Sequence, residues 1–509
     1  MTNVLRRLLL LTVAALVLLI VVIAGAAYWF FARDGFRLAL EAQATSWLGH
    51  PVHIGAARAQ FLPRLAVSLR DIRVGEPAQL TLAEVDLASD LRPLFSGRIE
   101  NADVTISDSR VDLPLPFGLP VSSNSSEQVE TVSGPPEGGH YVSAPAVRIV
   151  SIRSIALRSV RLRSRGREVV VSADSAYGGT ALALKNFTAE SGGTKLNAEG
   201  IIVISPRIDA RVNATANRLD LDELLALADA FAPAASGGSQ KKGQSPRIGA
   251  GITAKEVTAG GIKLQDFVTT LARDGESIAL NPLQFQAFGG RYAGSIVGRL
   301  GKQLSATLDA RIENVNVAQL AAFGGSPDSI TGTLSGVGKF NGSGADVTQL
   351  LRSVRGTGSA AIVDGSIRRL HLVRTVILFF GRPAPDGGES TDRFDRLDAQ
   401  FSIANRIVNA EALALHSPDA DTTGAGTLSL DSDALEGRVN VKLSEALTKQ
   451  AGTDLIRYTQ EGNRVVLPAT IGGTLSNPRL TIDVGAAAKR GLQNEVERRL
   501  KGLFDGLGR

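Results

Sequence analysis

Apolar and polar residues alternate along most of this chain, as in β-strands with one apolar and one solvent-facing side. The alternating segments are residues 65–69, 80–82, 104–106, 111–115, 155–162, 308–317, 439–443 and 480–484. Gly, Asp, Asn and Ser, which favour turns, lie between them. An antiparallel sheet tolerates one wet face, whereas a parallel sheet is covered on both. The sequence therefore predicts a mainly β protein built on antiparallel sheet.

An uncharged apolar run of 24 residues at positions 8–31 departs from this alternation. About 20 such residues suffice for a transmembrane helix. Arg6 and Arg7 precede the run, so the positive-inside rule keeps the N-terminus in the cytoplasm and places the rest of the chain outside it. A cleaved signal peptide is the alternative, because Ala24-Gly25-Ala26 resembles a cleavage site.

Two other segments have helical periodicity. Asp34 can cap a short amphipathic helix, which Gly49 and Pro51 would end. Residues 485–509 place apolar side chains on one side of a helix and most basic side chains on the other. This C-terminal amphipathic helix either covers the edge of the last strand or docks on an anionic membrane surface or a partner.

Composition and an internal repeat divide the chain. Residues 118–144 and 233–247 are polar linkers with little apolar content. Residues 184–187 resemble 264–267, and residues 208–212 resemble 308–312, which indicates repeating β-units. The predicted parts are a cytoplasmic tail (1–7), a transmembrane helix (8–31), an N-terminal helix and β-region (32–117), a linker (118–144), a β-repeat (145–232), a linker (233–247), a β-repeat (248–345), a C-terminal β-domain (346–484) and an amphipathic helix (485–509).

Composition also excludes several kinds of chemistry. The 509 residues contain no cysteine, which excludes disulfides, thiol catalysis and thiolate metal sites. The net charge is only +5 and no basic stripe with interleaved aromatics occurs, so nothing indicates nucleic-acid binding. Nucleophile-elbow, P-loop and dinucleotide motifs are absent, and Pro51 separates His50 from His53. We expect no enzyme activity and no catalytic, cofactor or metal site.

Short motifs at both ends of the chain resemble the bacterial AsmA family. The motifs are Leu48–Gly55, Leu62–Arg64, Leu69–Gly75, Gly356–Gly358, Ala361–Ile367, Thr391–Phe401, Leu413–Pro418, Gly424–Gly426, Leu467–Pro468 and Gly473–Arg479. His371 and Asn405-Arg406 depart from the family pattern. Members resemble bridge-like lipid-transfer proteins. The resemblance implies a long, curled β-sheet that forms a groove, and a part in outer-membrane biogenesis and phospholipid transport between the inner and outer membranes.

A one-sided sheet must bury its apolar face, either in a sandwich or in a trough filled by a ligand. We expect a trough for phospholipid acyl chains, in an inner-membrane protein whose bulk lies in the periplasm. The alternative is a non-transporting envelope scaffold, or a modulator of outer-membrane protein assembly, with a dry β core. Expected partners are phospholipid acyl chains, the inner membrane through 8–31, and the outer membrane or an envelope protein through 485–509. The predicted groove residues, which should share one face, are Val67, Leu82, Ile106, Leu308, Ile312, Val441 and Ile482.

Overall fold

The computed structural model describes residues 34–60, 64–90, 98–114, 148–149, 151–204, 207–231, 245–368, 370–380, 391–451, 456, 459–489, 491, 493, 495 and 496. The predicted transmembrane helix at 8–31, the linker at 118–144 and most of the linker at 233–247 lie outside these residues. Within the described part of the chain, every helix is too short or too polar to cross a bilayer.

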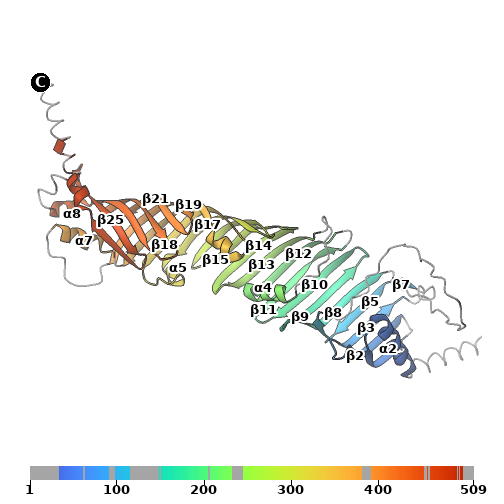
Figure 1. Cartoon of the computed structure of the whole chain (residues 1–509). Helices are drawn as coiled ribbons and strands as arrows, with labels where there is room; N and C mark the ends of the chain where they lie inside the picture. The colour runs from blue at the N-terminus through green and yellow to red at the C-terminus, as the bar shows by residue number, and fades with distance from the viewer. Residues whose placement is uncertain are drawn as a thin grey trace, which may run out of the picture. The chain divides into compact units, whose positions relative to one another are not determined.

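The chain divides into two compact units, each mainly β (Figure 1). Unit 1 comprises residues 1–250 and 257–260, and unit 2 comprises residues 251–256 and 261–509. The elements of unit 1 are α2 (Asp34–Leu48), β1 (Val52–Gln60), β2 (Leu65–Val74), β3 (Leu80–Ser89), β4 (Arg98–Ile99), β5 (Ala102–Ser107), β6 (Arg110–Leu113), β7 (Arg148–Ile149), β8 (Ile152–Ser164), β9 (Arg167–Tyr177), β10 (Ala181–Ser191), β11 (Thr194–Val203), β12 (Asp209–Asp220) and α4 (Leu221–Ala230).

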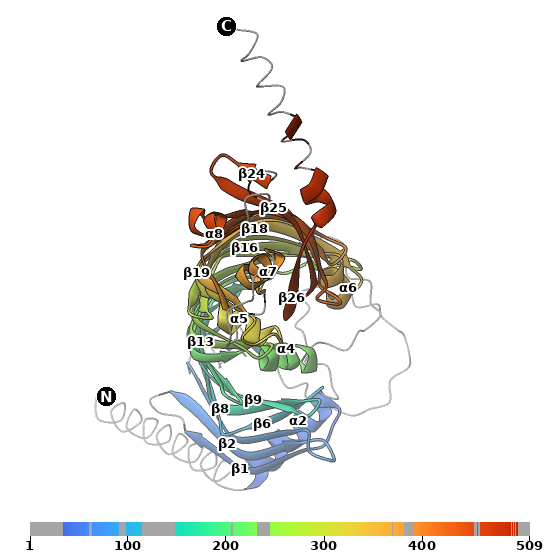
Figure 2. The ribbon, with the colours of Figure 1, turned by 90° about the vertical axis from the view of Figure 1, so that its left-hand side faces the viewer.

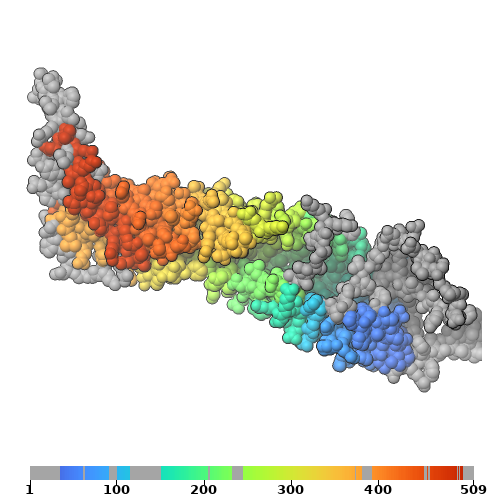
Figure 3. All heavy atoms as spheres, in the orientation of Figure 1, coloured from blue at the N-terminus to red at the C-terminus, as the bar shows by residue number. Residues whose placement is uncertain are grey.

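Strand β13 (Arg247–Ala259) carries residues of both units. The elements of unit 2 are β14 (Ile262–Asp274), β15 (Ser277–Ala287), β16 (Gly290–Arg299), β17 (Leu304–Asn316), α5 (Val317–Phe323), β18 (Ile330–Gly344), α6 (Val347–Arg352), β19 (Arg355–Arg368), α7 (Leu372–Phe379), β20 (Thr391–Ala404), β21 (Ile407–His416), β22 (Ala420–Ser429), β23 (Leu435–Leu443), α8 (Glu445–Gln450), β24 (Gln460–Glu461), β25 (Arg464–Thr474) and β26 (Asn477–Ile482). In the space-filling view, consecutive strands of unit 2 form adjacent bands from yellow to red (Figure 3).

The sheet of unit 1 corrects the prediction of purely antiparallel pairing. Strands β1, β2 and β3 pair antiparallel, as do β8 to β12 in succession. Strands β5 and β6, however, both pair with β8 in parallel. Parallel neighbours need a crossover of a dozen or more residues, and residues 114–151 between β6 and β8 supply that length. The polar segment interpreted as a linker is therefore the connection that permits the parallel pairing.

Helix α2 confirms the short helix predicted after the apolar run, and it packs on β1. It ends at Leu48 because Gly49 takes a left-handed backbone conformation with φ of 67°. The Glu41 carboxylate accepts a hydrogen bond of 2.6 Å from the Ile54 backbone N–H. Leu40, Ala44 and Leu48 pack against a buried cluster of β1, β2 and β3 side chains (Val52, Ile54, Ile72, Val74 and Val85).

The internal repeat corresponds to a repeated structural device. Strand β12 runs into α4, where the Asp220 side chain accepts a hydrogen bond from the backbone N–H of Glu223. Strand β17 runs into α5, where Asn316 accepts from Gln319 in the same way. Such side-chain caps satisfy one of the free N–H groups at a helix start. The matching segments 184–187 and 264–267 also both contain a register shift within their strand pairs.

Unit 2 is a continuous antiparallel succession from β14 to β23, followed by β25 and β26. Its main buried cluster lies under α7 and α8. A further helix begins at Val484, after Asp483 caps the N–H of Ala486. Most of the predicted amphipathic face at 485–509 lies outside the described residues.

Candidate functional site: the apolar face of the sheets

The strand register of unit 2 places apolar and small residues in rows across one face of the sheet. One row runs through Tyr292, Ile312, Gly336, Ala360, Ala399, Leu413, Gly424, Val439, Ala469 and Ile482. A second row runs through Leu308, Phe340, Gly356, Ile403, Val408 and Leu428. Because side chains alternate between faces, every second residue along these strands belongs to the other, polar face. We call this surface of unit 2 the apolar face.

Glycines and phenylalanines form the floor of the apolar face. A Cβ atom at Gly358 would lie 2.7 Å from the Phe401 ring and 2.8 Å from the Val337 carbonyl oxygen. A Cβ atom at Gly356 would lie 2.1 Å from the Lys339 carbonyl oxygen. These positions have no room for a side chain, so the neighbouring aromatic rings cover the glycine backbone instead.

The apolar face is open in its middle and closed at one end. Leu308, Ile312 and Phe340 are half-buried, because the sheet covers them from one side only. Val441 and Leu443, by contrast, are fully buried in the cluster beneath α7. The apolar face thus changes from a partly water-exposed surface to a packed core.

Helix α7 produces the closed end. Leu372 and Val376 on α7 are buried in the same cluster as the strand residues. Figure 2 shows α7 on the concave side of the unit 2 strands, near β26. The Asp392 carboxylate on β20 accepts a hydrogen bond of 3.0 Å from the Leu372 N–H at the start of α7. A cavity of about 360 Å³ adjoins this point, and its lining includes Ile367, Leu370, Phe394 and Leu415.

Unit 1 has a similar one-sided sheet. Val67, Leu82 and Ile106 are half-buried on one face of its strands, related by the β2–β3 and β3–β5 registers. Leu82 and Ile106 contact the buried cluster that α2 covers. A helix therefore closes part of this apolar face as well.

The seven predicted groove residues lie on the apolar face of their own unit. Leu308 and Ile312 lie in its open part, whereas Val441 and Ile482 lie in the packed cluster beneath α7. Their contact with lipid stays a prediction. The sequence analysis did not predict the aromatic and glycine floor, although the glycines at 332, 336, 338, 342 and 344, all an even number of positions apart, were a visible signal.

Few polar atoms interrupt the apolar faces. In the described residues, the buried hydroxyls of Thr269, Tyr292 and Thr422 have no hydrogen-bond partner. Burial, with a smaller contribution from Asp309, raises the pKa of Tyr292 above its ordinary value. The described part of the chain contains no group of three metal-ligating side chains. The face offers apolar area rather than reactive groups.

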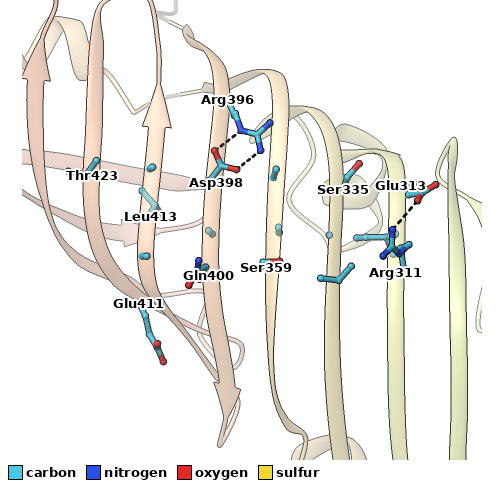
Figure 4. A pocket seen from close by; sticks show the side chains of 18 of the residues that line it. Arg311, Glu313, Ser335, Ser359, Arg396, Asp398, Gln400, Glu411, Leu413 and Thr423 are labelled. Atoms are coloured by element: carbon cyan, nitrogen blue, oxygen red, sulfur yellow. Dashed lines mark hydrogen bonds and ion pairs between the residues drawn. The ribbon is translucent and has the colours of Figure 1, made fainter.

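A hollow of about 910 Å³ crosses β17 to β22 (Figure 4), and its lining includes polar-face residues such as Arg311 and Asp398 together with first-row residues such as Ile312 and Leu413. Its charges are paired within single strands. Arg396 makes two hydrogen bonds of 2.7 Å to Asp398, and Arg311 lies 3.8 Å from Glu313. Exposed pairs of this kind contribute little free energy and suit a solvated surface.

The fold and this face define a class of protein that is built of one-sided β-sheets. Short helices close only part of each apolar face. The sequence model of the AsmA family matches residues 218–413. Protein AsmA of Escherichia coli (strain K12) is 20% identical over 265 residues, which is 49% of this chain and 40% of that protein. The matched region thus spans about two fifths of the relative. No solved structure matches the chain. The chain is an AsmA-like protein.

Proposed function

We propose that this AsmA-like protein is anchored in the bacterial inner membrane by residues 8–31. We further propose that its sheets bind phospholipid acyl chains in the periplasm and take part in lipid movement and outer-membrane biogenesis. The observation that carries the proposal is the half-buried state of Leu308, Ile312 and Phe340. A ligand that covers so apolar a face removes it from water, which lowers the free energy of the complex.

Acyl chains fit the chemistry of this surface. They need apolar area and no directional partner, and the floor consists of aliphatic side chains, phenyl rings and glycine backbone. Each methylene removed from water contributes about 0.8 kcal/mol. Because successive strands contribute similar residues to each row, an acyl chain can move along a row from one strand to the next and exchange similar contacts. The face therefore supports binding together with sliding.

A photoreactive residue at Ile312 tests the proposal in the full chain, in its native membrane. Arg311 is the matched control, because it is the adjacent residue and lies on the polar face of the same strand. Irradiation followed by mass spectrometry should detect a phospholipid adduct at position 312 and none at position 311. Equal labelling at both positions would indicate contact with bulk membrane and would contradict a lipid-binding face.

The packed clusters beneath α2 and α7 favour a second function, an envelope scaffold with a dry β core. In that case both photoreactive positions should remain free of lipid while the chain stays folded. An adduct to another protein at position 312 would support the scaffold. The two functions therefore give opposite results in one experiment.

A further inference from the structure

Three arginines lie in one row across the polar face of unit 1. The register aligns Arg73 on β2 with Thr81 on β3, Thr81 with Arg110 on β6, and Arg110 with Arg161 on β8. All three arginines are exposed, and none has a hydrogen-bond or ion-pair partner for its guanidinium among the described residues. With strands about 4.8 Å apart, the row spans roughly 14 Å. We call these three residues the arginine row.

The arginine row differs from three other arginines of unit 1. Arg70 pairs with Glu84 at 2.8 Å, Arg158 with Asp174 at 2.6 Å, and Arg163 with Glu168 at 3.0 Å. These three arginines are therefore neutralised by carboxylates, whereas the row is not. Arg110 and Arg161 also lie directly opposite each other, and like charges in that position destabilise a sheet. An anion bound between the guanidinium groups would remove this repulsion.

Phosphate groups match the row better than isolated carboxylates. A guanidinium presents a planar set of donors that binds phosphate oxygens with two hydrogen bonds at once. A row of three such groups fits several phosphates spread over a surface, as in the headgroup layer of an anionic bilayer.

The position of the row in the chain favours a membrane as the source of these phosphates. Asp34, the first residue of α2, follows the predicted transmembrane run by three residues, or at most about 10 Å of chain. Helix α2 is hydrogen-bonded to β1, and β1 pairs with β2, which carries Arg73. The row therefore includes a strand that α2 and β1 connect to the start of the described chain, three residues after the predicted run.

We propose that Arg73, Arg110 and Arg161 form a binding surface for the phosphate headgroups of anionic phospholipids, and that this surface orients unit 1 on the membrane. The inference rests on the proposed anchor and adds a lipid class and a docking face to it.

The test uses the full chain in nanodiscs of phosphatidylcholine, with or without phosphatidylglycerol. Because the chain has no cysteine, Thr81→Cys gives a single thiol in the middle of the row. A polar maleimide should label it about fivefold more slowly when phosphatidylglycerol is present, and high salt should abolish that protection. Asn197→Cys, on the exposed polar side of β11, should label equally in both lipids.

Two charge-matched triple variants isolate the row in this assay. Changing Arg73, Arg110 and Arg161 to Gln should abolish the protection of Thr81→Cys. Changing the ion-paired Arg70, Arg158 and Arg163 to Gln removes the same charge and should preserve the protection. Equal loss in both variants would show that net charge alone attracts the membrane, which overturns the proposal. Circular dichroism confirms that each variant is folded.

The remaining outcomes distinguish a failure of the arginine-row proposal from a failure of the proposed membrane anchor. Protection by inorganic phosphate alone in phosphatidylcholine discs would identify a free-phosphate site instead of a membrane surface. No protection in any lipid would also overturn the proposal. A chain that fails to incorporate into discs, but still sediments with phosphatidylglycerol vesicles through the arginine row, would refute the anchor and retain the row.

Discussion

Replacing Ile312 by Asp places a negative charge in the open part of the apolar face, and we expect the protein to stay folded. Ile312 is only partly exposed, so the lost transfer free energy is somewhat below that of a fully buried side chain, or roughly 1–2.5 kcal/mol. The new carboxylate stays in contact with water at the open side and escapes most of the penalty for a buried charge.

The same substitution at Val441 should have a much larger effect. Val441 is fully buried beneath α7, so an unpaired carboxylate there should cost about 3–5 kcal/mol of the free energy of unfolding. Thr307→Asp is the matched control, because Thr307 is exposed on the polar face of the strand that carries Ile312. Its stability should equal that of the unmodified protein.

Thermal denaturation followed by circular dichroism measures the three stabilities in the full chain. Lipid cross-linking from a photoreactive residue at Leu308 then measures occupancy of the face. Ile312→Asp should reduce this cross-linking about tenfold, since losing two methylene contacts costs about 1.6 kcal/mol. If Ile312→Asp unfolds the protein as severely as Val441→Asp, Ile312 belongs to a closed core and the open-face reasoning is refuted.

Three further predictions follow from particular contacts. Gly358→Ala should destabilise unit 2 by about 1–3 kcal/mol in denaturant titration, because a Cβ there would meet Phe401 and a backbone carbonyl. Gly472→Ala, whose nearest neighbour would be 3.9 Å away, should have little effect, and equal losses would contradict the packing argument. Burial would raise the pKa of Asp103, but hydrogen bonds from Arg153, Ser154 and Arg64 outweigh it and lower the pKa from 3.8 to about 2. Above about pH 4, ionised Asp103 should therefore stabilise unit 1 by about 1 kcal/mol, after allowance for solvent screening. This stabilisation should be lost as the pH falls towards 2 and Asp103 is protonated. Asp103→Asn should remove that pH dependence, and an unchanged acid denaturation curve would refute it. Asp392→Ala removes the hydrogen-bond acceptor at the start of α7. Hydrogen exchange of the α7 amides should therefore accelerate about fivefold, which corresponds to about 1 kcal/mol. Unchanged exchange would show that α7 is held by other contacts.

Local patterns in the sequence were sufficient to predict that the protein is mainly β. The period-two alternation predicted strands such as β17 and β23, because one wet face and one apolar face require that spacing. Gly49 and Pro51 predicted the end of α2, since glycine accepts the left-handed backbone there. The internal repeat predicted repeating β-units, and the two matching strands β12 and β17 are each followed by a short capped helix, α4 and α5.

Pairing between distant segments was decided only by the tertiary structure. Nothing in the composition of 102–113 showed that β5 and β6 would pair in parallel with β8, because the partner depends on where the crossover returns. Ile312 and Val441 look alike in the sequence, since both are aliphatic residues within alternating strands. They differ because α7 covers one and not the other, and Leu372 and Val376 reach the cluster from another part of the chain. The arginine row likewise exists only because the register aligns residues 73, 110 and 161 across the sheet, beyond the range of any local pattern.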